Sequence, residues 1–542
     1  MALALAAPCI AAVFFAFILP YCASFWQAFT GKLTILENAS LLHITAFTIK
    51  QAFLSVLVSL ALGLPGAWYL GSGKPHPILR TMSALPFAMP SILVVLGFVL
   101  FFGNSGWVNW LIGAITGREG PLRILYKPGA IILAHGFFNF PLVVRLAGDG
   151  LARVRKSYAP AAANLGSSPL MTAFYIILPL AIPSLMAASL LVFLYSFTSF
   201  AVVLVLGGGP ASTTLPVEIY RHAKIFLNYH NAGALALVET LIAISIFLAY
   251  VFFGRKARET ETDIEDQGFE IVKSSGSRFN IGSLLLTLYC LFAALFILGP
   301  IFSIILESFL WQPSRSAVKV ISFIWWRSLG ETCLPSLFRS LLLAFISASA
   351  ACILAILSAG SVKILDMQGK WKRSNFPLAN IIRFTSAAPI VSSGIVLGLG
   401  WLILYGRHLS FAPLSLVILH SVIALPFAFN SIAEGFRSLP ENTLAAASVL
   451  GASPIRMIFT IAIPLSFKRV CSAWGFAAAL SLGELNSVMM LGMEKWETLP
   501  LYIYRAAGAY RYGTACSAGT LLILSCAACL LLSEGFNKKI KM

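Results

Sequence analysis

Residues whose types and spacing could perform chemistry are few in this chain. The clearest candidate for nucleotide binding is Gly71-Ser-Gly-Lys74, which looks like the end of a phosphate-binding loop. Such a loop needs a glycine five residues before its second glycine, and Ser or Thr after the lysine to hold Mg²⁺. Trp68 and Pro75 occupy those two positions. We therefore expect any ATP-driven step to be performed by another polypeptide.

Cysteine and histidine residues offer little metal or redox chemistry. Cys526 and Cys529 form a CxxC pair, but it lies in an apolar segment without a nearby histidine, and small-residue packing is the better interpretation. His135 and His420 could form hydrogen bonds between helices or bind a metal, and we favour the hydrogen bonds. We find no nucleophile–base pair. The sequence therefore predicts no catalytic residue, no metal and no cofactor in this chain.

Three polar residues lie in long apolar segments where a solute could pass. Glu484 and Asn486 lie in the same segment, and Ser199 has the equivalent position in an earlier one. If these segments cross a bilayer, a central charge costs at least about 2.5–3.5 kcal/mol, so it usually faces a water-filled path or a partner. We predict that Ser199, Glu484 and Asn486 line a translocation pathway, where the carboxylate would attract a cation. A glutamate hydrogen-bonded within the bundle is the alternative.

A stretch that occurs twice organises the chain around these residues. The first copy begins Ala161-Ala-Ala-Asn-Leu-Gly-Ser-Ser-Pro, and the second begins Ala446-Ala-Ser-Val-Leu-Gly-Ala-Ser-Pro. The copies are 285 residues apart, and the same offset joins His135 to His420. A constant offset over such a length indicates an internal repeat.

Each copy predicts two short helices joined by a glycine turn. The Ala-rich run favours a helix, which Gly166 or Gly451 can end by adopting a left-handed conformation. The Ser-Pro pair that follows fits an N-cap and a first helical residue. Ser438 and Glu441 have the spacing of a capping box upstream of the second copy. An ordinary loop would explain one copy, but it explains two copies at one offset poorly.

The elements that carry these residues are apolar. Of the 542 residues, 59% are hydrophobic and 11% are charged, whereas soluble domains carry roughly 25% charged residues. Apolar runs near the ~20 residues that cross a bilayer predict an all-α polytopic membrane protein with about twelve transmembrane helices. The net charge of +18 fits basic cytosolic loops better than nucleic-acid binding. The expected spans are 3–26, 50–71, 84–103, 129–148, 179–206, 231–253, 282–306, 336–360, 383–405, 414–433, 464–491 and 516–534.

We divide the chain into a first half at 1–253, a cytosolic linker at 254–280 and a second half at 281–542. The linker is rich in charges of both signs, which is typical of a solvated connection. More than half of the lysines and arginines fall in segments that are cytosolic if the N-terminus is inside. This bias predicts that both termini and both repeated stretches lie in the cytosol.

The doubled Ala-Ala-x-x-Leu-Gly, followed by x-x-Pro, resembles the cytosolic "EAA" loop of type I ABC importer permeases. Within that family the chain is most similar to fused permeases that serve thiamine, and next to those that serve iron(III). The likeness rests on Leu133-Ala-His-Gly-Phe-Phe-Asn-Phe-Pro141, Ser199-Phe-Ala, Leu206-Gly-Gly-Gly-Pro210 and Thr498-Leu-Pro-Leu-Tyr-Ile-Tyr504. It covers nearly the whole chain.

The resemblance implies the type I ABC importer fold, with two pseudo-twofold related six-helix halves in a bacterial inner membrane. It implies a separate ATPase, expected as a homodimer that carries ATP and Mg, and a periplasmic or lipid-anchored binding protein. The chain would be the permease subunit for thiamine or its phosphates. The alternatives are an ABC permease for iron(III) or another small solute, and a secondary transporter with six plus six spans. The residues expected to couple to the ATPase are Ala161, Ala162, Leu165, Gly166, Pro179, Ala446, Ala447, Leu450, Gly451 and Pro464.

One departure from the family pattern concerns the glutamate that names the loop. Pro160 and Ala445 occupy its two positions, so the acidic contact to the ATPase is missing. Docking must then use the alanines, the glycine turn and the nearby Arg153, Arg155 and Lys156. Acids within the apolar segments are few, which argues against a secondary transporter that needs coupling-ion sites.

Overall fold

The computed structural model describes residues 2–538 apart from short stretches. The residues outside the description are 32–39, 72–88, 118–121, 208, 210–211, 266–280, 313–318, 331–332, 370–375, 392, 407–411 and 493–495, together with both chain ends. Most of the expected linker at 254–280 therefore lies outside the described residues, although one helix continues into it as far as Glu265.

Helices make up almost all of the described chain. Those of the first half are α1 (Ala2–Val13), η1 (Phe14–Ile18), α2 (Leu19–Thr30), α4 (Ser40–Leu70), α6 (Ser91–Phe102), α7 (Trp107–Thr116), α8 (Pro128–Asn164), α9 (Pro169–Thr172), η3 (Ala173–Ile177), α10 (Leu178–Phe197), α11 (Ala201–Leu206), α12 (Leu215–Lys224) and α13 (Tyr229–Glu265).

The second half follows the same general order and includes a two-stranded antiparallel hairpin. Its elements are α14 (Ile281–Glu307), β1 (Leu310–Trp311), β2 (Val320–Ile321), α15 (Ile324–Arg327), α16 (Cys333–Gly369), α17 (Phe376–Ala387), η5 (Ala388–Val391), α18 (Gly394–Tyr405), α19 (Ala412–Arg437), α20 (Glu441–Val449), α21 (Pro454–Met457), η7 (Ile458–Ala462), α22 (Ile463–Leu465), α23 (Phe467–Gly483), α24 (Asn486–Leu491), α25 (Leu499–Gly508) and α26 (Tyr512–Lys538).

Ten helices among the described residues are long and apolar enough to cross a membrane. Two further pairs of helices pass the same test when each pair is taken as one bent span. Residues 378–391 and 394–405 meet at 100°, and residues 454–465 and 467–483 meet at 77°. With these two pairs the total is twelve, in the order predicted from the sequence, so the predicted all-α polytopic fold is confirmed.

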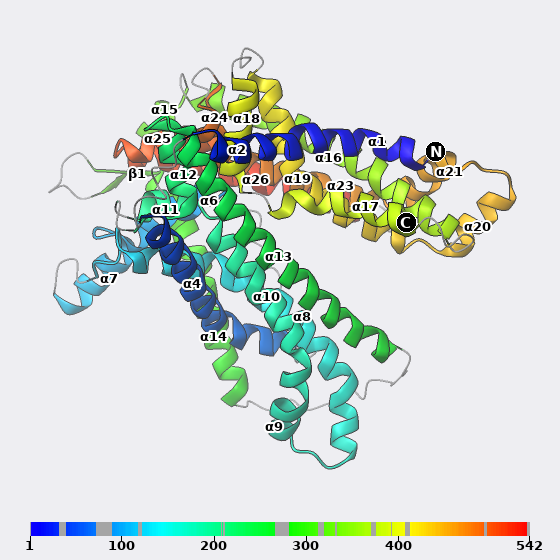
Figure 1. Cartoon of the computed structure of the whole chain (residues 1–542). Helices are drawn as coiled ribbons and strands as arrows, with labels where there is room; N and C mark the ends of the chain where they lie inside the picture. The colour runs from blue at the N-terminus through cyan, green and yellow to red at the C-terminus, as the bar shows by residue number, and fades with distance from the viewer. Residues whose placement is uncertain are drawn as a thin grey trace.

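Two arms diverge from a common junction in the structure (Figure 1). One arm contains α4, α8, α10 and α13, and the other contains α16, α17, α19 and α23. The short helices α11, α12, α24 and α25 lie at the junction. There the largest hydrophobic cluster joins the halves, with Leu206 and Leu215 of the first packed in the same core as Met490 and Leu499 of the second.

The first helix of each half packs into the other arm. Helix α1 lies along α16 (Figure 1), and its Ala6 and Cys9 share a core with Ala355 of α16. Helix α14 packs on α6 and α4, where Ala293 and Ile297 contact the core of the first arm. The two arms are therefore tied together by exchanged helices, a feature of packing that hydropathy alone does not predict.

Candidate functional site

Both repeated stretches form the same elbow, which we define as residues 161–169 in the first half and 446–454 in the second. Gly166 has φ +80° and Gly451 has φ +81°, so both are left-handed as predicted. The N–H of Gly166 bonds to the Ala163 carbonyl at 3.0 Å and that of Ser167 to the Ala162 carbonyl at 2.9 Å. The second elbow repeats this pair of bonds. This pattern is the Schellman helix end, which satisfies carbonyls that the helix leaves free.

A serine N-cap restarts the chain after each turn. The Oγ of Ser168 accepts the N–H of Met171, and the Oγ of Ser453 accepts the N–H of Arg456, both at 3.3 Å. A proline then begins each short helix, α9 or α21, because its missing N–H would have no partner there. The prediction of a glycine turn followed by a Ser-Pro cap is confirmed in both halves.

Two details of the elbow prediction are wrong. The helix before the first turn is not short, because α8 continues unbroken through Pro141 and Pro160 to Asn164. Ser438 does not form a capping box with Glu441, since α20 begins after Pro440 and the Ser438 hydroxyl bonds back to the Gly435 carbonyl at 2.9 Å.

The residues predicted to couple to the ATPase divide into exposed and buried positions. Leu165 and Leu450 are 89% and 88% exposed at the tips of the elbows. Leu450 lies beside Val449, which is 86% exposed, and apolar side chains gathered on a surface mark an interaction site. Ala162 and Ala447 are buried against the helix behind them. The remaining predicted residues, which are exposed, are Ala161, Gly166, Pro179, Ala446, Gly451 and Pro464.

Basic residues near the first elbow are only partly available to a partner. The Arg155 guanidinium lies 5.2 Å from the ring centroid of Trp68, a cation–π distance, and its side chain is half-buried. Arg153 and Lys156 are exposed. Docking at the first elbow would therefore use the latter two more readily than Arg155.

Spans five and eleven break at equivalent positions near the junction of the arms. Helix α10 ends at Phe197 and α11 begins at Ala201, while α23 ends at Gly483 and α24 begins at Asn486. Ser199 and Glu484 lie in these breaks, 285 residues apart. Broken helices expose backbone and side-chain polar groups where a membrane protein encloses a path or binds a solute.

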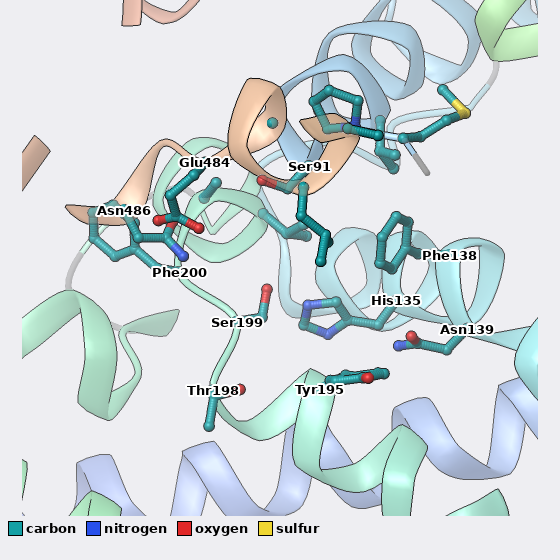
Figure 2. Close-up of a pocket in the computed structure, with 18 of the residues that line it drawn as sticks. Ser91, His135, Phe138, Asn139, Tyr195, Thr198, Ser199, Phe200, Glu484 and Asn486 are labelled. Carbon is teal, nitrogen blue, oxygen red and sulfur yellow. The ribbon is translucent and has the colours of Figure 1, made fainter. Parts of the chain in front are cut away.

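A cavity of about 270 Å³ lies between the halves and contains all three predicted pathway residues, Ser199, Glu484 and Asn486. Elements α6, α8, α10 and α11 line it from the first half, and α19, α23 and α24 from the second. Figure 2 shows the labelled polar side chains of both halves turned toward this common space. Aromatic side chains complete its wall: Phe138, Tyr195, Phe200, Phe427 and Phe476.

The Glu484 carboxylate is hydrogen-bonded in the cavity wall. Its Oε1 accepts the backbone N–H of Ser487 at 3.0 Å, which satisfies a donor at the start of α24. A Cβ on Gly394 would lie 3.1 Å from Glu484 Oε1, so the bend of span nine approaches the carboxylate closely because residue 394 is glycine. Asn486 Oδ1 has no hydrogen-bond partner among the described residues.

The paired histidines fix the two breaks by hydrogen bonds between helices. His420 Nδ1 lies 2.8 Å from the Ser481 hydroxyl, and its Nε2 lies 3.4 Å from the Ser487 hydroxyl on the other side of the break. His135 Nδ1 lies 3.1 Å from Gln51 Oε1, and the Gln51 amide donates to the Ser196 carbonyl at 2.9 Å. The interhelical interpretation of the histidines is confirmed.

Several residues of the site were missed by the sequence reasoning. Asn139 lines the cavity and donates to the Ser196 hydroxyl at 3.1 Å, and Ser196 and Ser481 are themselves 285 residues apart. This offset was the signal that could have found the pair. Glu239 is buried on α13, outside the cavity lining.

Two related sets of membrane-spanning helices that enclose one cavity define this chain as a membrane permease. A family model described as the binding-protein-dependent transport system inner membrane component matches residues 55–258 and again residues 353–541. The chain therefore belongs to this family of ABC importer permeases, multi-pass inner membrane proteins that are transport subunits rather than enzymes. The family description states that transport by its members depends on a binding protein, and membership of an ABC permease family implies an ATPase partner.

The relatives match this chain over most of its length. The thiamine transport system permease protein ThiP of Brucella suis is 29% identical over 506 residues, which cover 91% of this chain and 87% of the relative. ThiP of Escherichia coli is 24% identical over 90% of this chain and 88% of its own length. The ferric transport system permease protein FbpB of Actinobacillus pleuropneumoniae is 23% identical over 88% of this chain and 69% of its own. The resemblance to fused permeases is thus confirmed.

Proposed function

We propose that this chain is the membrane-spanning subunit of an ATP-driven importer that carries thiamine or its phosphates across the bacterial cytoplasmic membrane. A periplasmic or lipid-anchored binding protein delivers the solute. Both termini and both elbows face the cytosol, where a separate ATPase binds ATP and Mg. The names of the relatives support the solute, and the paired elbows support the mode of energy supply.

The observation that carries this proposal is the equality of the two elbows. Their glycines differ by 1° in φ, and the exposure of their leucines differs by one percentage point. Two equal docking surfaces on one chain fit two copies of one ATPase, because a homodimer presents the same surface twice. A secondary transporter has no use for such surfaces.

The chemistry of the central cavity supports a cationic aromatic solute. Thiamine carries a positive charge on a planar ring, and the cavity offers the Glu484 carboxylate among aromatic faces that attract cations. Ser199, Glu484 and Asn486 line this cavity, and their part in the translocation pathway remains a prediction.

Iron(III) is the second candidate, because a ferric permease is among the relatives. A hard cation of this kind prefers several oxygen ligands at once. The cavity lining contains one carboxylate, Glu484, among the described residues. A bare ferric ion therefore fits this lining less well than an organic cation does.

Reconstitution tests the proposal. The chain is placed in proteoliposomes with its ATPase and binding protein, and uptake of radiolabelled thiamine is measured with and without ATP. An ATPase variant that binds but does not hydrolyse ATP is the control. We expect uptake that requires hydrolysis and that excess unlabelled thiamine abolishes. Uptake driven by an ion gradient without the ATPase, or uptake of iron(III) in place of thiamine, would refute the proposal.

A further inference from the structure

A second cavity, of about 260 Å³, lies at the junction of the two arms. It is bounded by α6 and α11 of the first half and by α25 and the start of α26 of the second. Four tyrosines and one arginine give it its chemical character. These residues, which we call the tyrosine pocket, are Tyr126, Tyr504, Tyr510, Tyr512 and Arg505.

The tyrosine pocket and the central cavity share two walls. On α6, Val94 lines the central cavity while Val95 lines the tyrosine pocket. On α11, Val202 lines the first and Leu204 the second. The two spaces therefore lie on either side of the same pair of helices, and their volumes differ by only about 10 Å³.

Backbone geometry indicates that the tyrosine pocket is more than a packing gap. Only three residues other than glycine have positive φ in the described chain: Tyr126, Leu227 and Tyr510. Two of the three line this pocket, with φ of 60° and 58°. Such conformations are costly for residues with a Cβ, and they concentrate where a protein binds ligands.

The side chains of the pocket suit a planar aromatic ring with positive charge. The Tyr510 and Tyr512 rings are 6.2 Å apart and nearly perpendicular, so one ring edge and one ring face are available together. Tyrosine faces attract cations and stack on flat rings. The Arg505 guanidinium donates to Glu497 Oε1 at 2.9 Å, so its charge is offset by a carboxylate. Burial raises the pKa of the Tyr504 phenol, which therefore stays protonated and can donate a hydrogen bond.

We propose that the tyrosine pocket is a second binding site of the permease, which receives a planar heteroaromatic cation before it passes α6 and α11 into the central cavity. The identity of the solute rests on the proposed function, whereas the existence of the site does not. In the proposed orientation the pocket lies on the extracytoplasmic side, where the binding protein delivers its solute.

The other half offers a matched control at the equivalent position. Tyr220 and Arg221 correspond to Tyr504 and Arg505 at an offset of 284 residues. There the Arg221 guanidinium bonds to Glu218 and lies 5.5 Å from the ring centroid of Phe226. Phe226 is 54% exposed and lines neither cavity, so Phe226→Ala removes an exposed ring from the same kind of position without altering the pocket.

Equilibrium dialysis tests the site on the assembled permease–ATPase complex in nanodiscs, without the binding protein and with radiolabelled thiamine as the probe. The variant is Tyr510→Asn, because Asn tolerates the left-handed backbone while removing the ring. Tyr510 is 79% exposed, so the core is left intact. We expect the wild type and Phe226→Ala to bind two equivalents. In Tyr510→Asn one equivalent should bind about fivefold more weakly or be lost, while Glu484→Gln should affect the other.

Each result separates this site from the proposed function. One equivalent in the wild type, sensitive to Glu484→Gln alone, overturns the second site and leaves thiamine import standing. Two equivalents that Tyr510→Asn does not weaken also overturn it. If thiamine is neither bound nor transported, pyrithiamine and other heteroaromatic cations are dialysed in its place. If two equivalents of one of these cations bind, and Tyr510→Asn weakens one of them, the site is supported and the identity of the solute is corrected. If none of these cations binds in this way, the site is overturned.

Discussion

Replacing the elbow glycines is the most direct test of how this chain is coupled to its motor. A Cβ built on Gly166 or Gly451 meets no heavy atom within 4 Å. Substitution with alanine therefore adds no steric clash with the rest of the protein. The perturbation acts on the backbone alone, because φ of +80° and +81° is unfavourable for any residue that carries a Cβ.

The size of the effect follows from this geometry. The left-handed conformation costs an L-residue about 1–2 kcal/mol, which corresponds to a factor of about 5–30 in an equilibrium constant. If the ATPase binds only the turned elbow, Gly166→Ala should weaken its docking by that factor. The two elbows lie at the ends of different arms, so their effects should multiply in the double variant, to about 25-fold or more.

The assay compares ATPase affinity and transport per ATP hydrolysed in proteoliposomes. Asparagine at the same position is the matched control, because it is larger than alanine yet tolerates the left-handed conformation better. We expect weaker docking and less uptake per ATP in Gly166→Ala, with Gly166→Asn between it and the wild type. Chain insertion should be unchanged, since both glycines are exposed. Equal losses in the two variants, or no loss in either, would refute the role of the turn.

Three further predictions concern the cavity and the caps. Glu484→Gln should slow uptake of a cationic solute several-fold while basal ATP hydrolysis is retained, and unchanged uptake kinetics would remove Glu484 from the pathway. Gly394→Ala should also slow uptake, because its Cβ would lie 3.1 Å from Glu484 Oε1; a transport rate equal to that of the wild type would show that the carboxylate can move aside. Ser453→Ala removes the cap of α21 and should destabilise the second elbow by about 1 kcal/mol, seen as faster proteolysis there, with Ser453→Thr, which keeps a capping hydroxyl, as the control.

The elbows could be predicted from the sequence because their causes are local. A glycine ends a helix and a serine begins one through hydrogen bonds to residues at most five positions away, as Gly166 and Ser168 do. The apolar spans were predictable for a similar reason, since bilayer thickness fixes their length. The prediction of a short helix before Gly166 was wrong, because α8 continues through Pro160 although proline cannot donate the backbone hydrogen bond of a helix.

Long-range packing could not be predicted in the same way. Gly394 begins the second of two helices that meet at 100°, and it closely approaches Glu484, a residue 90 positions later. The Gln51–Ser196 bond joins helices 145 residues apart, and hydropathy does not report such pairs. The repeat offset placed Ser199 and Glu484 at equivalent positions, but it could not reveal that the helices break there or that both residues line one shared cavity.

The exchange of first helices has a consequence for synthesis. Phe140 and Val144 of the first arm share a core with Ala293 and Ile297, which the ribosome adds about 150 residues later. The first arm therefore lacks its packing partner α14 until translation is more than half complete. The N-terminal helix waits longer still, because its neighbour α16 emerges only after residue 333. A gene cut at the linker would yield two fragments that must exchange these helices in order to assemble.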